Sequence, residues 1–218
     1  MIKPLHVTLV SLLTIDGRIT RGPGAPSRDI IEQLGPEGKT DLHRYRAEAG
    51  AIAVGGRTVL IDNPSLTTRY VDGRNPLRVI FGGSCGFQGT EAVLCDGGPT
   101  VLVADPGATL PQLGHSVEVI RAKQDTAALL EVCQVVSSRF SVSTLMLEGG
   151  ATLTRSFFAA RLIDEIVVYV VPCLAARSDA PGLTAHPVPD CGMGIVSCEA
   201  VGQCVKAYTA CRGIGHER

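Results

Sequence analysis

The sequence predicts an α/β protein whose central sheet is mainly parallel. Short apolar segments alternate along the chain with segments of helical periodicity. This alternation is typical of parallel strands joined by helices that cover both faces of a sheet. Two apolar segments run into glycine pairs, Gly55-Gly56 and Gly149-Gly150. Two last strand-like segments, joined across Gly202-Gln203, predict an antiparallel hairpin at the sheet edge.

Length, composition and charge limit the classes of protein to consider. The chain has 218 residues, 45 % of them hydrophobic, so it can form a sizeable core. It contains no internal repeat or linker, and we expect a single domain over residues 1–218. The net charge of −1 provides no basic field for nucleic acid. No apolar run approaches the roughly 20 residues that span a bilayer, and polar residues interrupt the N-terminal apolar run, so we expect a cytoplasmic protein.

The N-terminal part predicts a strand, a loop and a helix. Residues Leu5–Leu13 form a β-rich apolar run that suits a buried parallel strand, closed by a turn at Asp16-Gly17. Residues 21–39 are rich in Gly and Pro and predict an irregular loop with one helical turn. Residues Asp41–Glu48 have apolar side chains at helical spacing and predict a helix that ends at Gly50.

The central part predicts a strand at Ala51–Val54, followed by a short helix after Gly55-Gly56 and a polar loop at Asp62-Asn63-Pro64. Further short apolar segments bounded by Gly or Pro predict strands at Leu77–Phe81, Thr100–Ala104 and Val117–Arg121.

The C-terminal part predicts two more helix and strand pairs before the hairpin. Helices are expected at Thr126–Phe140 and Ala151–Arg161, each with an apolar stripe. Strands are expected at Thr144–Leu147, Ile163–Val171, Ile195–Val201 and Cys204–Cys211, with a Pro- and Gly-rich loop at Ala175–Met193.

The two glycine pairs are candidate nucleotide-binding turns. A strand that ends in bare glycines and leads into a helix lets a phosphate approach backbone N–H groups at the helix N-terminus. Ligands of open α/β sheets bind at the carboxyl ends of strands, where both pairs are expected. The alternative is a tight strand-to-helix turn without a ligand. Neither Gly-x-Gly-x-x-Gly nor a P-loop motif is present.

Polar residues beside these turns are candidates for ligand contacts. Asp62 is a candidate acceptor for a polar substrate, and Arg69 can bind a phosphate through two hydrogen bonds. Arg46 is a candidate second anion-binding residue or simply a solvated helix residue. Glu148 can accept from ring N–H groups, and Thr58 either caps its helix or bonds a cofactor phosphate.

Cysteine and histidine spacing indicates no metal site. None of the eight cysteines forms Cys-x-x-Cys, and no histidine stands at zinc-finger spacing. We expect free, buried thiols. The histidines are scattered, and we assign a role to none of His6, His43, His115, His186 and His216.

Several motifs, in this order, resemble those of one enzyme family. They are TIDGRI, the RAEAGAI junction, AIAVGGRTVLIDNPSLTTR and LMLEGGATLTRSFFAARLIDEIVVYVVP. They look like the reductase domain of riboflavin biosynthesis, which is the 5-amino-6-(5-phosphoribosylamino)uracil reductase or its diamino-pyrimidinone counterpart in archaea and fungi. The resemblance extends from about Val7 to Pro172. It implies a three-layer fold similar to dihydrofolate reductase, here as a stand-alone reductase with no deaminase domain.

The resemblance also implies a cofactor, a substrate and residues that bind them. NADPH would contact Gly55, Gly56, Thr58, Asp62 and the turn Gly149, Gly150, Ala151, Thr152 and Leu153. The substrate phosphate and ribose would contact Arg46, Leu66 and Arg69, while Glu148 would hold the pyrimidine. Hydride would pass to C1′ of the opened ribosylamino group and give a ribitylamino product, with Asp62 and Glu148 as catalytic candidates. The family is commonly a homodimer.

Three departures from the family pattern concern the substrate side. Val10 stands where the family carries Lys or Asn, and valine cannot donate to a substrate or transfer a proton. The serine segment after the first turn is missing, with Ser27 a distant candidate, and Ala175 or Ala176 replaces a late glycine. These changes keep two alternatives open: a reductase of another pyrimidine, pterin or natural-product intermediate, and a non-catalytic nucleotide-binding relative. Ser84 is a candidate contact to the 2′-phosphate that distinguishes NADPH from NADH.

Overall fold

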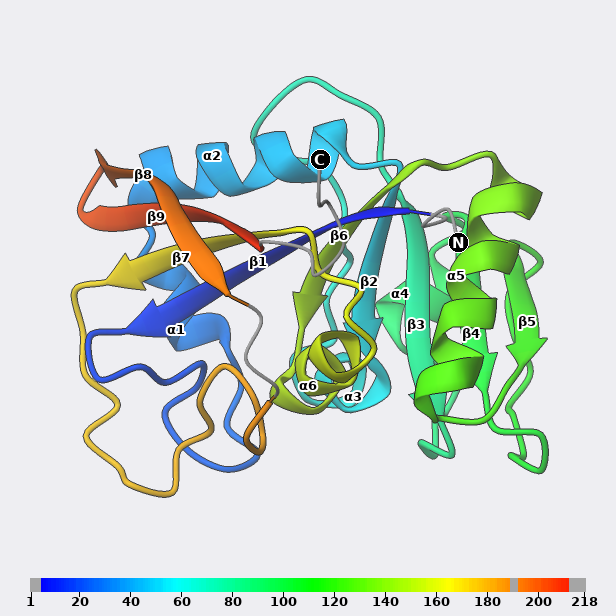
Figure 1. Cartoon of the computed structure of the whole chain (residues 1–218). Coiled ribbons are helices and arrows are strands. Elements are labelled where there is room, and N and C mark those ends of the chain that lie inside the picture. Colours follow the sequence, from blue (N-terminus) through cyan, green and yellow to red (C-terminus); the bar gives the residue numbers. More distant parts are fainter. Residues whose placement is uncertain (1–4, 189–191, 212–218) are drawn as a thin grey trace.

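The computed structural model describes residues 5–188 and 192–211. In this part of the chain, nine strands form one sheet in the order β5-β4-β3-β2-β6-β1-β7-β9-β8 (Figure 1). The strands are β1 (His6–Thr14), β2 (Ala51–Gly55), β3 (Leu77–Gly83), β4 (Thr100–Ala104), β5 (Val117–Arg121), β6 (Thr144–Gly149), β7 (Glu165–Val171), β8 (Met193–Val201) and β9 (Cys204–Cys211).

The sheet is parallel except at its C-terminal edge, as the sequence predicts. Every strand pairing from β5 across to β7 is parallel. Only β9 runs against its neighbours β7 and β8. The carboxyl ends of β2, β3 and β6 therefore lie at one edge of the sheet, at the bottom of Figure 1.

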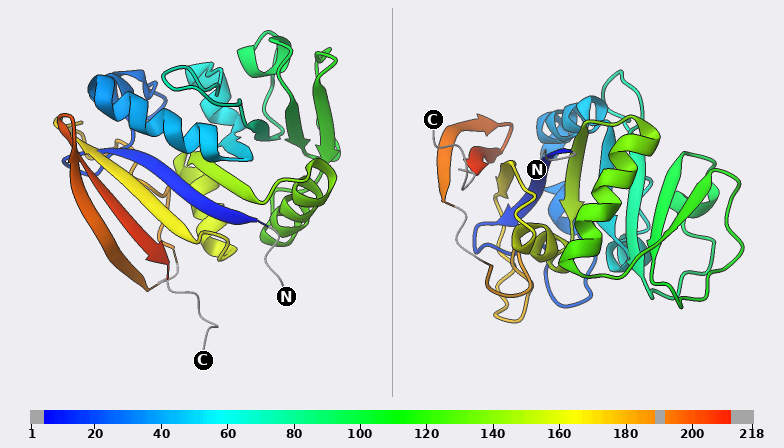
Figure 2. Two further views of the ribbon diagram at one scale, coloured as in Figure 1. Left: turned by 90° about the horizontal axis from the view of Figure 1, so that it is seen from above. Right: turned by 45° about the vertical axis from the view of Figure 1, so that its right-hand side comes forward.

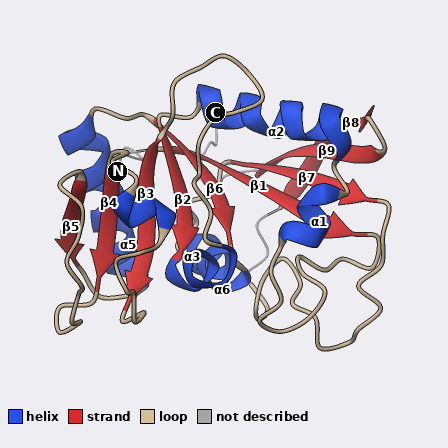
Figure 3. Ribbon diagram, turned by 180° about the vertical axis from the view of Figure 1, so that it is seen from behind, coloured by secondary structure: helices blue, strands red, loops and turns tan. Residues whose placement is uncertain are grey.

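Helices cover both faces of the sheet and make three layers. They are α1 (Arg28–Glu32), α2 (Gly35–Glu48), α3 (Gly56–Asp62), α4 (Ala92–Cys95), α5 (Thr126–Phe140) and α6 (Ala151–Ala159). Seen from above, α2 lies on one side of the strands and α5 and α6 on the other (Figure 2). From behind, α1, α2, α3 and α4 lie in front of the sheet (Figure 3).

Each face of the sheet has its own apolar core, because side chains alternate along a strand. On β1, Leu9 packs with the core beneath α5 and α6, which includes Phe157. The next residue, Val10, packs with the opposite core, which includes Leu42 of α2 and Val59 of α3. The alternation places Val10 on the face that carries the larger cavity described below.

Most predicted elements are confirmed, with three corrections. The helix expected at Asp41–Glu48 begins six residues earlier, at Gly35, because Pro36 occupies the first turn, where its missing N–H costs nothing. Helix α4 was not predicted, since four residues carry too little periodicity to detect. Gly50 does not end α2; the helix ends at Glu48, and extended Ala49 follows.

Asp16, in the turn after β1, holds the loop that follows β7. Its carboxylate accepts from the Thr14 hydroxyl at 2.6 Å and from the backbone N–H groups of Ala175 and Ala176 at 3.0 Å each. These bonds hold the pKa of Asp16 at about 2. Ala176 has φ 55°, the left-handed region that glycine enters without steric cost. The replacement of glycine here therefore leaves the backbone shape intact.

The cysteine prediction is confirmed in part. Free thiols, rather than disulfides, are found at Cys85, Cys95, Cys173, Cys198 and Cys204. Cys95 and Cys198 are exposed, so the expectation of burial is wrong for both. Cys191 and the side chain of Cys211 lie outside the described residues. Within the described ranges, no helix is both long and apolar enough to cross a membrane.

Candidate functional site

The two glycine turns lie side by side, because β2 and β6 are neighbours in the sheet. Gly150 caps α6 with φ 98°, and a Cβ atom on it would lie 2.7 Å from Oγ1 of Thr58 on α3. A Cβ atom on Gly56 would lie 2.8 Å from the Cys85 sulfur and 2.9 Å from Cα of Gly82. Both positions therefore require glycine, because the starts of α3 and α6 pack closely against neighbouring groups.

Residues of these turns line two cavities. The larger, of about 370 Å³, is lined by β1, α1, α2, α3, the loop after α3 and the end of β6. The second, of about 330 Å³, is lined by Gly55, Gly56, Thr152 and Leu153, and by residues of β3, α5 and the loop before α5. Gly149, Gly150 and Thr58 line the larger cavity. Residues of the two turns and of the helices that follow them thus line both cavities. One elongated ligand could therefore occupy both.

Arg46 and Glu148 meet in the wall of the larger cavity. The Arg46 Nε and Nη2 groups donate to the two Glu148 carboxylate oxygens at 2.5 and 2.7 Å. Burial lowers the pKa of Arg46, but attraction to Glu148 outweighs this and keeps it above its ordinary value. Arg46 is a buried ion-pair partner rather than a solvated helix residue, and neither charge stands alone.

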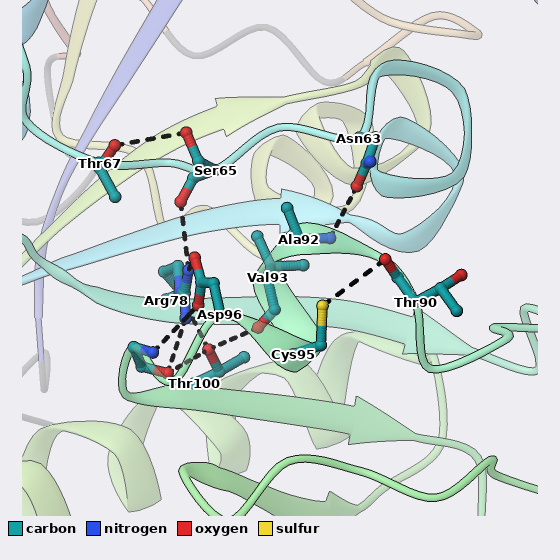
Figure 4. Close-up of polar contacts among 11 residues, drawn as sticks. Asn63, Ser65, Thr67, Arg78, Thr90, Ala92, Val93, Cys95, Asp96 and Thr100 are labelled. Atoms are coloured by element: carbon teal, nitrogen blue, oxygen red, sulfur yellow. Dashed lines mark hydrogen bonds and ion pairs between the residues drawn. The ribbon is translucent and has the colours of Figure 1, made fainter.

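The loop after α3 carries Leu66 and Arg69 and is held from several sides. The Asn63 side-chain oxygen accepts from the backbone N–H of Ala92 at 2.8 Å, and the Ser65 carbonyl accepts from Arg78 at 3.3 Å (Figure 4). Arg78 is buried and also donates to both carboxylate oxygens of Asp96 at 2.7 Å. These contacts join the loop to β3 and α4.

Leu66 has a backbone conformation that non-glycine residues rarely adopt. Its φ is 54°, and its side chain is fully buried in the cavity wall. On either side, Ser65 and Thr67 turn their carbonyl oxygens to Arg78 and Arg46, respectively, each at 3.3 Å. Backbone strain of this kind persists where surrounding contacts hold it in place. Two ion-paired arginines therefore shape the cavity wall at Leu66.

Asp62, at the end of α3, binds the segment that leads into α1. Its carboxylate accepts from the backbone N–H of Ser27 at 2.8 Å and from the Ser27 hydroxyl at 2.9 Å. Ser27 is the N-cap residue of α1, but its side chain turns to Asp62 instead of capping the helix. Ser27, the distant candidate for the missing serine segment, thus lies in the cavity wall and is bonded to Asp62.

His43 lies one helical turn before Arg46 and lines the same cavity. Its Nδ1 accepts from the backbone N–H of Arg69 at 3.0 Å, and its ring meets Tyr70 edge-on at 4.8 Å. Burial, together with the charges of Arg46 and Arg69, lowers the pKa of His43 to about 4, against an opposing effect of Glu148. The imidazole is therefore neutral at pH 7.

The sequence matches one known protein family over most of its length. The model of the RibD C-terminal domain matches residues 5–206. The chain belongs to the RibD C-terminal domain family.

Similar proteins agree with this assignment. The 2,5-diamino-6-ribosylamino-4(3H)-pyrimidinone 5′-phosphate reductase of Aquifex aeolicus is 30 % identical over 187 residues, which cover 82 % of this chain and 81 % of that protein. Its namesake from Methanothermobacter thermautotrophicus is 34 % identical over 184 residues, 80 % of this chain and 81 % of that one. A solved structure of Acinetobacter baumannii RibD has a TM-score of 0.78 at 20 % identity; the alignment covers 94 % of this chain and 57 % of that longer one. This last likeness bears on the fold, which is that of the RibD reductase domains and is similar to dihydrofolate reductase.

In this RibD C-terminal domain, most of the predicted site residues line the two cavities at the glycine turns. Those that line the larger cavity are Arg46, Thr58, Asp62, Leu66, Arg69, Glu148, Gly149 and Gly150. Those that line the second cavity are Gly55, Gly56, Thr152 and Leu153. Ala151 begins α6 but lines neither cavity. Thr58 does not cap α3, whose N-cap is Gly55 without a side-chain bond.

Val10, the departure on the first strand, stands in the wall of the larger cavity. It is 2 % exposed and lies opposite Val167 of β7. Residues that the sequence reasoning missed also line this cavity, among them Arg28, Lys39 and His43. The signal for His43 was its i, i+3 spacing to Arg46, which puts both side chains on one helix face.

Among the described residues, no group of three or more His, Cys, Asp and Glu side chains lies close enough to hold a metal ion. The acidic residues that line the larger cavity are bonded to protein groups: Glu32 to Lys39, Asp62 to Ser27 and Glu148 to Arg46.

Proposed function

We propose that this protein is an NADPH-dependent reductase that converts a phosphoribosylamino-pyrimidine to its ribitylamino form in riboflavin biosynthesis, as a cytoplasmic enzyme. The observation that carries the proposal is the pair of neighbouring glycine turns at Gly56 and Gly150, beside a cavity lined by Arg46, Glu148 and Arg69. The reductase names of the Aquifex and Methanothermobacter relatives support it.

The residues at the two glycine turns fit a nicotinamide dinucleotide. Gly149 and Gly150 line the larger cavity at the start of α6, where the helix dipole favours a negatively charged group. Thr58 and Asp62 of α3 line the same cavity. The bound nicotinamide supplies a hydride, and the protein orients the substrate and excludes water.

A preference for NADPH is supported by cations in the second cavity. Arg57 and Lys123 line it and can pair with a 2′-phosphate. The earlier candidate, Ser84, donates its hydroxyl to Asp105 at 2.5 Å and does not line the cavity. We therefore assign the 2′-phosphate contact to Arg57 and Lys123 in place of Ser84.

Arg69 is the residue best placed to bind the substrate phosphate. In the described part of the chain, its guanidinium donates to the hydroxyls of Ser65 and Thr67 rather than to a carboxylate. Its charge is therefore not neutralised by an acidic partner. Arg46 and Glu148 act as a pair, in which the carboxylate faces the cavity and can accept from pyrimidine N–H groups.

Val10 favours a second candidate function. Its apolar side chain forms part of the cavity wall and can neither donate a hydrogen bond nor transfer a proton. A reductase with the same cofactor and another pyrimidine, pterin or natural-product substrate would have no need of a polar group there. This candidate keeps every cofactor contact and changes only the substrate.

We also propose that the protein is a homodimer, as its family resemblance implies. The outer strand β8 exposes apolar side chains, with Ile195 77 % and Val196 61 % exposed. An apolar edge strand of this kind is a surface that a second chain can cover. Light scattering on the wild type and on Ile195→Lys tests this: a dimer that becomes a monomer supports it, and a wild-type monomer contradicts it.

The first experiment is a calorimetric titration with NADPH, followed by an assay of NADPH oxidation with the phosphoribosylamino-pyrimidine. No NADPH binding contradicts both reductase functions. Binding without turnover of this substrate rejects the first and leaves the second. Arg69→Ala should lower kcat/KM by about one to two decades, because a charge-assisted phosphate contact contributes roughly 1.5–3 kcal/mol. Arg74→Ala, at an exposed arginine nearby, serves as the control.

A further inference from the structure

His43 occupies a position that the cofactor and substrate assignments above do not use. It lies on α2 between the backbone of Arg69 and the guanidinium of Arg46, and it is 3 % exposed. Its ring lines the larger cavity together with Arg46 and Arg69. A buried polar ring in a ligand cavity is expected to have partners for both nitrogens.

The hydrogen bond from Arg69 determines which ring nitrogen carries the proton. Nδ1 accepts the Arg69 backbone N–H at 3.0 Å, so Nδ1 has no proton. A neutral imidazole has one acceptor and one donor nitrogen, and the proton must therefore be on Nε2. The His43 ring is a donor at the edge that lies beside Arg46.

That donor has no acceptor among its described neighbours. The polar atom near Nε2 is Nη1 of Arg46, at 3.5 Å, and a guanidinium nitrogen only donates. Nη1 itself donates to the Thr67 carbonyl at 3.3 Å. A buried N–H without a protein acceptor is costly, and in a ligand cavity an oxygen atom of the ligand can serve as its acceptor.

The charges around His43 favour an anionic oxygen as that acceptor. The groups that face the ring are Arg46 on α2, Arg69 on the loop and Glu148 on β6. Glu148 is neutralised by Arg46, and the charge of Arg69 remains. A protonated His43 would be repelled by Arg46 and Arg69. The neutral ring avoids this repulsion, and its N–H can donate to the same anion that Arg69 attracts.

We propose that the Nε2–H group of His43 donates a hydrogen bond to the substrate's phosphate oxygen, next to Arg69. This assignment rests on the proposed phosphorylated substrate. It gives His43 two tasks on opposite ring edges: Nδ1 holds the loop that carries Arg69, and Nε2 binds the ligand.

Two substitutions separate these tasks. In His43→Asn the amide oxygen can still accept from the Arg69 N–H, but the distal donor is lost. In His43→Gln an amide N–H reaches toward the place of Nε2, and the proximal acceptor is lost. His115→Asn, at an exposed loop histidine, is the matched control.

The experiment measures binding of ribose 5-phosphate, inorganic phosphate and ribose by calorimetry, and records long-range 1H–15N spectra of the wild type. We expect the Nε2–H tautomer at His43 and binding of both ribose 5-phosphate and inorganic phosphate.

His43→Asn should weaken phosphate binding about tenfold or more, since a hydrogen bond to a charged group is lost, and should leave NADPH binding unchanged. In the turnover assay, His43→Asn should raise KM and change kcat by no more than about twofold, because the lost bond stabilises the bound substrate and the transition state equally. His43→Gln should restore part of the affinity.

Equal phosphate affinities of the wild type and His43→Asn would overturn the proposal, as would an Nδ1–H tautomer. Loss of NADPH binding in His43→Asn would also overturn it, because the substitution would then act on the whole fold. A wild type that binds no ribose 5-phosphate contradicts both this proposal and the proposed substrate. A wild type that binds ribose 5-phosphate through His43 but reduces no phosphoribosylamino-pyrimidine contradicts only the proposed function.

Discussion

Arg46 and Glu148 form a two-bond ion pair between residues 102 positions apart in the chain, with N–O distances of 2.5 and 2.7 Å. One lies on α2 and the other at the carboxyl end of β6. The pair therefore links the helix layer to the sheet directly at the cavity wall. Because both side chains are largely buried, removal of either one leaves an unpaired charge.

Single substitutions of this pair are expected to cost more stability than the double substitution. Glu148→Gln should lower the free energy of unfolding by about 3 kcal/mol, because a buried guanidinium loses its counter-charge. Arg46→Met combined with Glu148→Leu should cost less than either Arg46→Met or Glu148→Leu alone. Urea unfolding of the wild type, Arg46→Met, Glu148→Leu and the double variant measures the interaction energy between the two side chains. Additive losses would show that the two side chains do not interact.

Gly150→Ala is expected to impair cofactor binding. A Cβ atom would meet Oγ1 of Thr58 at 2.7 Å, and φ 98° disfavours any L side chain. We expect at least a tenfold higher Kd for NADPH, that is, about 1.4 kcal/mol or more, measured by calorimetry. Gly107→Ala is the control, since a Cβ atom there meets nothing within 4 Å. An unchanged Kd in Gly150→Ala would show that the turn at Gly150 is not part of the cofactor site.

The elements predicted correctly from the sequence are those whose local residue pattern matches what the backbone requires at that place. Strand β2 and the turn at Gly55-Gly56 were predicted because an apolar run ends at glycines, and the close approach of Gly82 to Gly56 explains that choice. The fifteen residues of α5 were predicted to the residue from its apolar stripe, and the structure shows in addition that Asp125 caps the helix.

What the sequence did not reveal depends on partners far along the chain. Asp41 was expected near a helix start, but it lies inside α2 and accepts from Tyr169 at 2.7 Å and Lys206 at 2.8 Å. Burial and this bond to Asp41 raise the pKa of Tyr169. The roles of His43 and Arg78 likewise come from the loop at 63–69, which folds back against both. No local periodicity encodes such contacts.

Ala176→Gly is expected to stabilise the fold. At φ 55° alanine bears a steric penalty of about 1 kcal/mol, which glycine avoids. Glycine also increases the entropy of the unfolded chain, so the net gain should be below about 1 kcal/mol. The urea midpoint measures this gain in stability. Ala108→Gly is the control and should give no gain, because Ala108 does not have a positive φ. A lower midpoint for Ala176→Gly would mean that the alanine is not strained.

Asp16 is expected to make stability depend on pH in the acid range. Hydrogen bonds from Thr14, Ala175 and Ala176 lower its pKa in the folded state from 3.8 to about 2. The folded state thus binds the proton less readily than the unfolded state, so the stabilisation is present above pH 3.8 and is lost as the pH falls toward 2. Asp16→Asn cannot titrate and lacks this contribution. The difference in urea midpoint between wild type and Asp16→Asn should therefore narrow over that interval, while exposed Asp72→Asn should follow the wild type throughout. Parallel curves for wild type and Asp16→Asn would show that the bonds to residues 175 and 176 contribute no net preference for the charged carboxylate.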